Sequence, residues 1–212
     1  MSTLTKLKKE SSSNYHHGNL RDSLIIAGLE ILESTQSTEF SLRELTRQVG
    51  VTANAIYRHF ANKEELLTAM AVEGFRKLIN AQGIAVQTCS KPAESFLAAG
   101  KAYIIFACHN PTLFRLMYGR FSSVTEHEEV KTAAQFAYDA MRYSLAIVLG
   151  KPADEQQVIV ASIHAWSVIH GLSHLIIDGQ VDRHVTNIED LINAVMQQTL
   201  PLLTLRKSDK KY

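Results

Sequence analysis

Apolar residues recur every three or four positions along most of the chain, which is the spacing of an amphipathic α-helix. The first such segment runs from near Asn19 to about Ser34, with Asp22 favourably placed in its first turn. The second half shows neither the strict alternation of a β-strand nor an internal repeat. The pattern therefore predicts an all-α protein.

Residues 41–60 carry the pattern of two short helices joined at a glycine. Ser41 followed three residues later by Glu44 forms a capping box, in which the hydroxyl accepts from a backbone N–H and the carboxylate returns to the cap. Gly50 supplies a left-handed turn that other residues resist. Thr52 is expected to cap the second helix.

The second of these helices has two different faces. Ile56 and Phe60, four residues apart, form the inward face. The outward face carries small, hydrogen-bonding or charged residues: Thr52, Ala53, Asn54, Tyr57 and Arg58. Two helices this short cannot bury their apolar faces alone, so the segment from Asn19 is expected to be the third wall of a helix-turn-helix module.

Six further helices are predicted after residue 60, bounded by cap residues, glycine or proline. Thr125 with Glu128, and Thr186 with Glu189, have the spacing of helix caps. The predicted helices run from Asn62 to about Thr88, Pro92 to Asn110, Pro111 to Gly119, Thr125 to Leu149, Ala153 to Asp178 and Thr186 to Pro201.

The helix predicted at 153–178 is apolar nearly all round. Such a helix must be buried on more than one side, and a chain of this size offers little depth. We expect a homodimer through the helices near 153–178 and 187–203, an isologous interface of four helices.

Composition limits the choices further. The formal charge of +1 over 212 residues argues against coating a polyanion, but eight basic against six acidic residues through Lys63 leave a local basic excess at the N-terminus. Cys89 and Cys108 lack metal or redox spacing. Because no uninterrupted apolar run approaches the roughly 20 residues of a membrane helix, we expect a soluble, cytoplasmic protein without membrane partners.

The N-terminal motifs together resemble the DNA-binding domain of the TetR family of bacterial transcription regulators. The resemblance covers residues from about 15 to 80, and Thr46 departs from it where such modules commonly have alanine. The diagnostic part of this resemblance has two pieces. The first is a glycine followed by an apolar residue and Ser/Thr. The second is a tyrosine, any residue and His-Phe, with a lysine three residues further on. The matching runs are Tyr15–Arg21, Ser41–Leu45, Val49–Thr52, Ala55–Phe60 and Lys63–Leu67.

The resemblance implies that Tyr57, His59 and Lys63 contact phosphates, which suits a phenol, an imidazole and a lysine at a helix N-terminus. Thr52, Ala53 and Asn54 are the expected base-reading residues, and an asparagine can pair with adenine through two hydrogen bonds. The alternative for Tyr57 is a packed core aromatic. The full predicted DNA-binding set is Ser41, Arg47, Thr52, Ala53, Asn54, Tyr57, Arg58, His59 and Lys63.

Two stretches of the second half, 110–119 and 165–172, resemble a C-terminal domain type of this family that carries a Trp, His-Gly (WHG) pattern. The resemblance implies a helical bundle that senses a small-molecule effector and dimerises. Each candidate effector residue has the alternative of being plain core. The candidates are Tyr103, Phe106, Phe114, Met117, Trp166 and His170.

A competing hypothesis starts from His170, His174 and Asp178, which lie four apart on one helical face. An all-α metal-binding protein or enzyme would use such a row. We expect neither a bound metal nor a cofactor, because no second carboxylate cluster at ligand spacing supports it. No catalytic triad or phosphate loop stands out either, so an enzyme is not expected.

The sequence thus predicts four parts: a flexible basic arm (1–19), a helix-turn-helix domain (20–63), a ligand-binding and dimerisation domain (64–205) and a polar tail (206–212). The expected function is that of a ligand-responsive transcriptional regulator, a repressor. It would bind a (pseudo)palindromic double-stranded DNA operator as a dimer and be released by an unknown small-molecule effector.

Overall fold

The computed structural model describes residues 20–119, 123–181 and 184–204, so the predicted arm and tail lie outside the described residues. Every regular element in these ranges is a helix, which confirms the all-α prediction. The elements are α1 (Leu20–Thr35), α2 (Leu42–Val49), α3 (Ala53–Ile56), α4 (Lys63–Val86), α5 (Pro92–His109), α6 (Pro111–Tyr118), the 3-10 helix η1 (Ser123–Glu126), α7 (Glu128–Leu149), α8 (Gln156–Ile177) and α9 (Ile188–Thr204).

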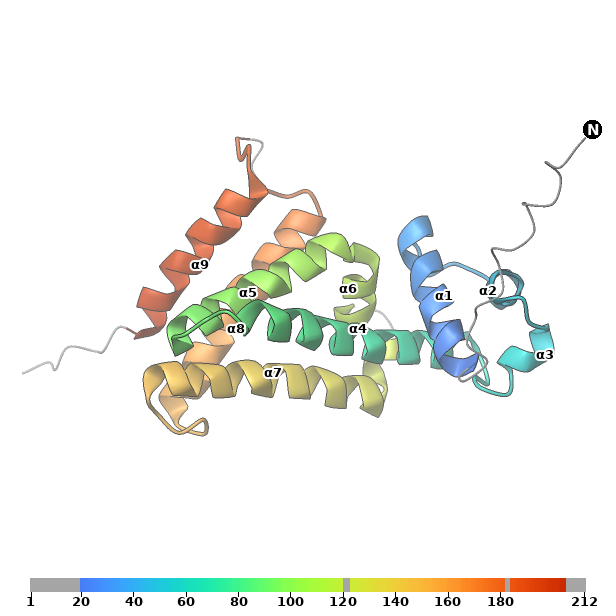
Figure 1. Ribbon diagram of the computed structural model, residues 1–212, viewed down its shortest axis with the longest axis horizontal. Coiled ribbons are helices and arrows are strands. Elements are labelled where there is room, and N and C mark those ends of the chain that lie inside the picture. Colours follow the sequence, from blue (N-terminus) through green and yellow to red (C-terminus); the bar gives the residue numbers. More distant parts are fainter. Residues whose placement is uncertain (1–19, 120–122, 182–183, 205–212) are drawn as a thin grey trace, which may run out of the picture.

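The helices form a small N-terminal module and a larger bundle, and α4 runs from one into the other (Figure 1). The module consists of α1, α2 and α3, and its centre is closed by Leu24, Leu45 and Ile56, each with no exposed surface. Three short helices reach this burial only together. The helix-turn-helix predicted at residues 41–60 is therefore present.

Local caps fix the ends of the module's helices. Ser41 Oγ accepts from the Glu44 N–H at 3.1 Å, as predicted, and Gly50 has φ of 76°, in the left-handed region. The predicted side-chain cap at Thr52 is wrong, because its hydroxyl makes no capping hydrogen bond and its backbone oxygen accepts from Ala55 N instead. The turn is thus closed by the main chain.

Threonine at position 46, where such modules commonly have alanine, destabilises the module little. Its side chain is 5% exposed, and its hydroxyl donates to the Arg43 carbonyl at 3.0 Å within the same helix. A buried hydroxyl with a partner avoids most of the desolvation penalty. Threonine is therefore tolerated at this helix interface.

The long helix α4 begins at a side-chain cap, since Asn62 Oδ1 accepts from the Glu65 N–H at 2.9 Å. It packs on α1 where Gly28 faces Met70. Farther along, Leu78 and Phe75 are buried in the larger bundle. Helix α4 thus carries one continuous core from the module into the bundle.

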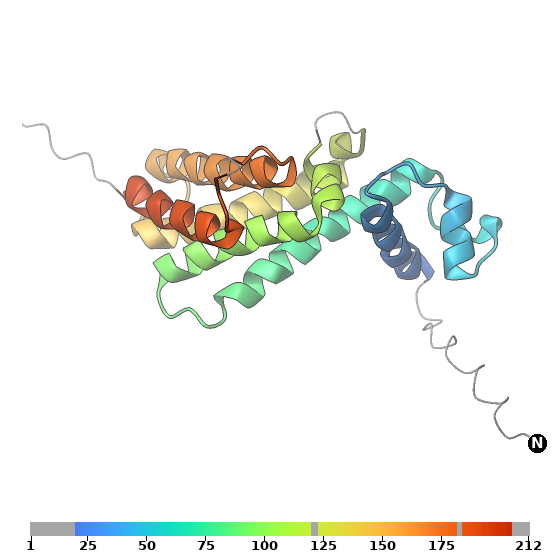
Figure 2. The same ribbon diagram turned by 90° about the horizontal axis from the view of Figure 1, so that it is seen from above.

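In the larger bundle, α5 and α7 pack between α4 on one side and α8 on the other (Figure 2). Helix α9 covers α5 and α8. The short α6 lies against α4 and α1, beside the junction with the N-terminal module. Helix α6 is therefore, with α4, an element of the bundle that packs on the module.

Two predicted caps in the bundle are wrong. Thr125 Oγ1 donates to the Gly119 carbonyl rather than capping α7, whose N-cap residue is His127. Asn187, not Thr186, caps α9, because its Oδ1 accepts from the N–H groups of Glu189 and Asp190.

Helix α9 continues past Pro201 to Thr204, beyond its predicted end. Proline removes one main-chain donor but does not end a helix that is already in its last turn.

Helix α8 is less buried than its composition predicts. Val160, Ile163 and Leu175 are 55, 51 and 45% exposed on its outer side. By length and composition alone α8 could cross a membrane, but the core helix of a soluble protein passes the same test. The predicted partner for this face is a second copy of α8.

Candidate functional site

The outward face of the helix-turn-helix is open to solvent. Ile56 and Phe60 point into the module with 0 and 2% exposure, which leaves Thr52, Ala53 and Asn54 exposed on the opposite side of α3. Tyr57 is 56% exposed, so the alternative of a packed core aromatic is wrong. The structure thus presents a one-turn helix whose accessible side carries hydrogen-bonding groups.

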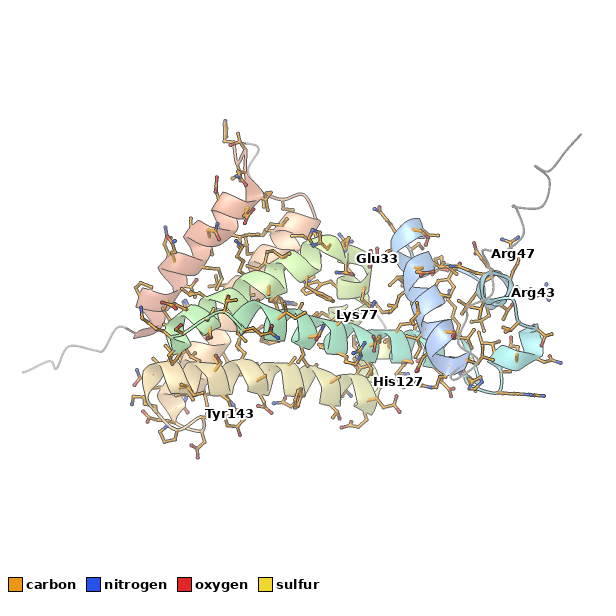
Figure 3. All side chains as sticks on the ribbon, in the orientation of Figure 1. Glu33, Arg43, Arg47, Lys77, His127 and Tyr143 are labelled. Atoms are coloured by element: carbon orange, nitrogen blue, oxygen red, sulfur yellow. The ribbon has the colours of Figure 1, made fainter. Side chains whose placement is uncertain are left out.

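Basic residues of α2 lie beside this face. Figure 3 shows Arg43 and Arg47 on α2 at the end of the molecule where α3 also lies. Arg47 belongs to the predicted set, whereas sequence reasoning missed Arg43. The available signal was their spacing of four residues, which places both guanidinium groups on one helical face. Guanidinium groups flanking an exposed helix suit phosphate contacts.

The remaining predicted phosphate-binding residues are exposed or half-buried around the same module. Lys63 is the first residue of α4, and its Nζ lies 5.1 Å from the Phe40 ring centroid. Sequence reasoning also missed Arg21, whose guanidinium carbon lies 5.2 Å from the ring centroid of Phe60. Cation–π contacts hold the two charges at the rim of the core while leaving their N–H groups available to a ligand.

Three other predicted residues are also accessible. Arg58 and His59 are exposed in the turn after α3. Ser41 is exposed too, and its oxygen accepts from a backbone N–H, so its proton can still be donated to a phosphate. The predicted set therefore lies on the module and at the first residue of α4, and the core is closed behind it.

A cluster of rings fills the bundle between α5, α6 and α8. The hydroxyl of Tyr103 lies 2.9 Å from Nδ1 of His170. The Phe114 ring centroid is 5.6 Å from that of Tyr103 and 5.5 Å from that of His170. Four of the six predicted effector residues thus belong to a group that we call the aromatic cluster: Phe75, Tyr103, Phe114, Tyr118, Trp166, His170 and His174.

Trp166 lies at the edge of the cluster, and the other two predicted effector residues are not among its members. The Trp166 ring is 5.4 Å from that of His170, but the residue is 38% exposed. Met117 is buried against Gly74 of α4, and Phe106 is buried on α5. Sequence reasoning missed Tyr118, whose ring centroid is 4.8 Å from that of His170. The aromatic cluster is therefore larger than the sequence predicted.

Burial keeps Tyr103, Tyr118 and His170 of the aromatic cluster uncharged at neutral pH. It raises the pKa of Tyr118 to about 12 and that of Tyr103 well above its ordinary value, so both phenols keep their protons. Burial, followed by the nearby His174, lowers the pKa of His170 from 6.5 to about 4. These three residues thus offer ring surface with neutral polar groups, which suits an uncharged ligand.

A pH dependence of stability follows from His170. Below pH 6.5 the unfolded chain takes up a proton at this residue, while the folded protein resists protonation until about pH 4. We expect the urea midpoint to fall as the pH drops from about 6.5 to about 4, and this part of the loss to be absent in His170→Asn. His109→Asn, at an exposed position of α5 away from this helix, is the control and should not remove this part of the loss.

The side chains of His170, His174 and Asp178 already contact other groups of the protein. Nδ1 of His170 faces Tyr103, and Oδ1 of Asp178 accepts from Arg115 at 2.6 Å. His174 Nδ1 lies 3.8 Å from Asp178 Oδ2. Among the described residues no group of three His, Cys, Asp or Glu side chains is placed to hold a metal ion. The geometry gives the metal-binding alternative no support.

Two shallow hollows in the described part of the chain lie away from the aromatic cluster. One lies on α9 beside Gln197 and Pro201, and the other beside Ile147 and Gly150 at the turn between α7 and α8. Neither is lined by the predicted effector residues. An effector site in the aromatic cluster therefore remains a prediction.

Comparison with known sequences matches both parts of the chain to described families. Residues 27–70 match "Bacterial regulatory proteins, tetR family", and residues 96–199 match "Tetracyclin repressor-like, C-terminal domain". A similar protein is the HTH-type transcriptional activator FasR of Mycolicibacterium smegmatis. It is 26% identical over 151 residues, which are 70% of this chain and 68% of FasR.

Solved structures share the fold. A protein of unknown function from Rhodococcus sp. RHA1 has a TM-score of 0.74 and 26% identity, with 91% of this chain and 100% of that chain covered. The fatty acid degradation regulator FadR from Bacillus halodurans has a TM-score of 0.66 at 14% identity, with 86% and 95% covered. At that identity the likeness to FadR concerns the fold alone.

Proposed function

The chain belongs to the TetR family of bacterial regulatory proteins, and from this premise we propose that it is a ligand-responsive repressor that binds a pseudopalindromic operator as a homodimer. Regulators of this family bind DNA, and they are in general cytoplasmic and not enzymes. The observation that carries the proposal is the exposed row Thr52 to Asn54, held over the buried Ile56 and Phe60. That arrangement presents hydrogen-bonding groups to a major groove.

Within the interface we assign two different roles. Asn54, at the open N-terminal side of α3, reads a base edge, because its amide can both donate and accept. Tyr57, His59 and Lys63 bind phosphates, which positions the module without reading sequence. Arg43 and Arg47 add charge from α2 beside it.

Substitution separates the two roles. Asn54→Ala is expected to relax base preference at one operator position by about 1–3 kcal/mol, since a bidentate contact discriminates by that amount. Lys63→Ala should weaken binding to all sequences alike and reduce the salt dependence by about one phosphate contact. Fluorescence anisotropy on a set of singly mutated duplexes measures both quantities.

Gln48→Ala is the matched control. Gln48 is exposed on α2 and donates to Glu30 within the module, and it lies outside the proposed set. The DNA affinity and base preference of the Gln48→Ala variant should stay near those of the wild type. Equal loss of base preference in the Asn54 and Lys63 variants would overturn the division of roles.

The proposed dimer uses the outer side of α8. Val160, Ile163, Ser167 and Gly171 recur there at spacings of three and four, so they form one stripe. A side chain added at Gly171 would meet nothing within 4 Å, so packing inside one protomer does not require this glycine. Glycine costs about 1 kcal/mol in a helix interior. A partner helix crossing closely at Gly171 accounts for its presence, and α9 flanks the same interface.

The proposed mechanism places the effector in the aromatic cluster. The rings contact one another directly, so an effector must displace some of them, and Phe114 and Tyr118 belong to α6. A shift of α6 against α1 and α4 would change the separation of the two recognition helices in the dimer. Affinity falls if the effector binds the mismatched state more tightly.

We propose repression rather than activation, and this choice needs its own test because the similar protein FasR is by name an activator. A transcription assay with the bound duplex placed at a promoter decides it. Added protein should lower transcript yield for a repressor.

A further inference from the structure

Helix α6 takes part of its N-terminal cap from the DNA-binding module. The Leu113 N–H, in the first turn of α6, donates to Oε1 of Glu33 on α1 at 2.9 Å. The N-cap residue Asn110 makes no side-chain capping bond to α6, and its amide nitrogen donates to the Phe106 carbonyl of α5. The carboxylate that satisfies this helix end therefore comes from 80 positions away in the sequence.

Glu33 lies where its own helix disfavours it. It is in the last turn of α1, which has no basic residue, at the negative end of that helix's dipole. The same carboxylate meets the positive end of α6. Its charge is thus unfavourable for α1 and favourable for α6, which indicates that the contact with α6 accounts for an acid at this position.

The other sides of α6 are also fixed. A Cβ at Gly74 of α4 would lie 2.6 Å from Met117 Sδ and 3.0 Å from Leu113 Cδ1, so α6 packs directly on the α4 backbone. Arg115 donates to the Ile177 carbonyl and to Asp178 at the end of α8. Helix α6 therefore connects α1, α4 and α8, and it cannot move without changing at least one of these contacts.

We propose that Glu33 is the positioning residue that couples the aromatic cluster to the DNA-binding module, through its cap on α6. This rests on the proposed function. Because Phe114 and Tyr118 lie on the same two turns as Leu113, a displacement of the rings moves the donor that Glu33 holds. By linkage, DNA binding that moves α1 must in turn shift α6 and the rings around it.

A second polar contact joins the module's side of the molecule to the bundle. Oε1 of Glu64, at the start of α4, lies 2.9 Å from Nε2 of His127. This contact is independent of α6. Loss of Glu33 alone should therefore reduce the coupling without abolishing it.

The chain's single tryptophan allows a test that needs no effector. Trp166 lies next to His170 in the aromatic cluster, on α8, whereas Glu33 lies on α1. A duplex is first selected from a random pool with the full-length protein. Trp166 emission is then recorded while that duplex is titrated into the wild type and into Glu33→Ala, Glu33→Gln and Glu30→Ala.

In the wild type, duplex binding should change Trp166 emission. In Glu33→Ala the change at saturation should shrink at least about twofold, in line with the effect of single residues on coupling. Glu33→Gln keeps a carbonyl acceptor for Leu113 N–H and should restore most of the change. Glu30→Ala removes an acid from the same helix whose carboxylate accepts from Gln48 within the module, and should behave as wild type.

The outcomes separate two failures. If no duplex is enriched by the wild type, the proposed function fails. If the wild type binds a duplex but its Trp166 emission does not change, or if Glu33→Ala responds as the wild type does, the coupling role of Glu33 is overturned. A loss of response in Glu30→Ala equal to that in Glu33→Ala also overturns it.

Discussion

Ile163→Glu is expected to make the protein monomeric and to weaken its binding to a palindromic duplex by about 100-fold or more. Ile163 is 51% exposed on the outer stripe of α8, and the proposed dimer buries it against the partner. A carboxylate placed unpaired in an apolar interface costs several kcal/mol, and each 1.4 kcal/mol is a tenfold change in affinity. Sedimentation velocity gives the oligomeric state, and anisotropy gives the DNA affinity.

Ile147→Glu is the matched control for this substitution. Ile147 is 67% exposed on α7, and it receives the same change on a different helix. It should remain dimeric and keep its DNA affinity. A dimeric Ile163→Glu, or a monomeric Ile147→Glu, would place the interface elsewhere.

Phe114→Ala is expected to destabilise the protein by about 3–5 kcal/mol, the range for truncating a buried phenylalanine. Its side chain has no exposed surface, and it contacts the rings of Tyr118 and His174 at centroid distances of 5.0 and 5.3 Å. For a chain of this length the melting temperature should fall by about 6–20 °C. Calorimetry or circular dichroism measures the shift.

Phe136→Ala provides the comparison, because Phe136 is 64% exposed on α7. The loss of folding stability in Phe136→Ala should stay within about 0.5 kcal/mol, as for most surface substitutions. A loss below about 1 kcal/mol for Phe114→Ala would contradict the close packing of the aromatic cluster. It would mean that the site collapses readily or already holds space for an effector.

Helical periodicity predicted the elements of this fold well, because most helices present one apolar face to a common core. Caps were less predictable. Ser41 and Thr52 have similar capping chemistry, yet only Ser41 uses its side chain. Sequence spacing shows that a hydroxyl can reach a donor, but a competing acceptor decides whether it does: Thr125 donates to a carbonyl instead of capping.

The proposed DNA-binding face could be described from the sequence because its residues lie within one short segment. The aromatic cluster could be predicted from the sequence only in part. Tyr118 and His170 are 52 positions apart, and periodicity cannot say that α6 and α8 bring them together. Trp166 shares the apolar character of α8 but lies at its exposed flank. The Glu33 cap on Leu113 joins α1 to α6 across 80 positions of sequence, so no local pattern could reveal it.

The central claim is that residues 41–63 read DNA, and selection from a random pool of duplexes with the purified full-length protein tests it most directly. We predict enrichment of one pseudopalindrome whose half-site centres are roughly 34–36 Å apart or a multiple of that distance. Its affinity should fall linearly on a log–log plot as salt rises, because phosphate contacts release counterions. Enrichment of no sequence, with the protein folded and Asn54, Tyr57 and Lys63 intact, would contradict the claim.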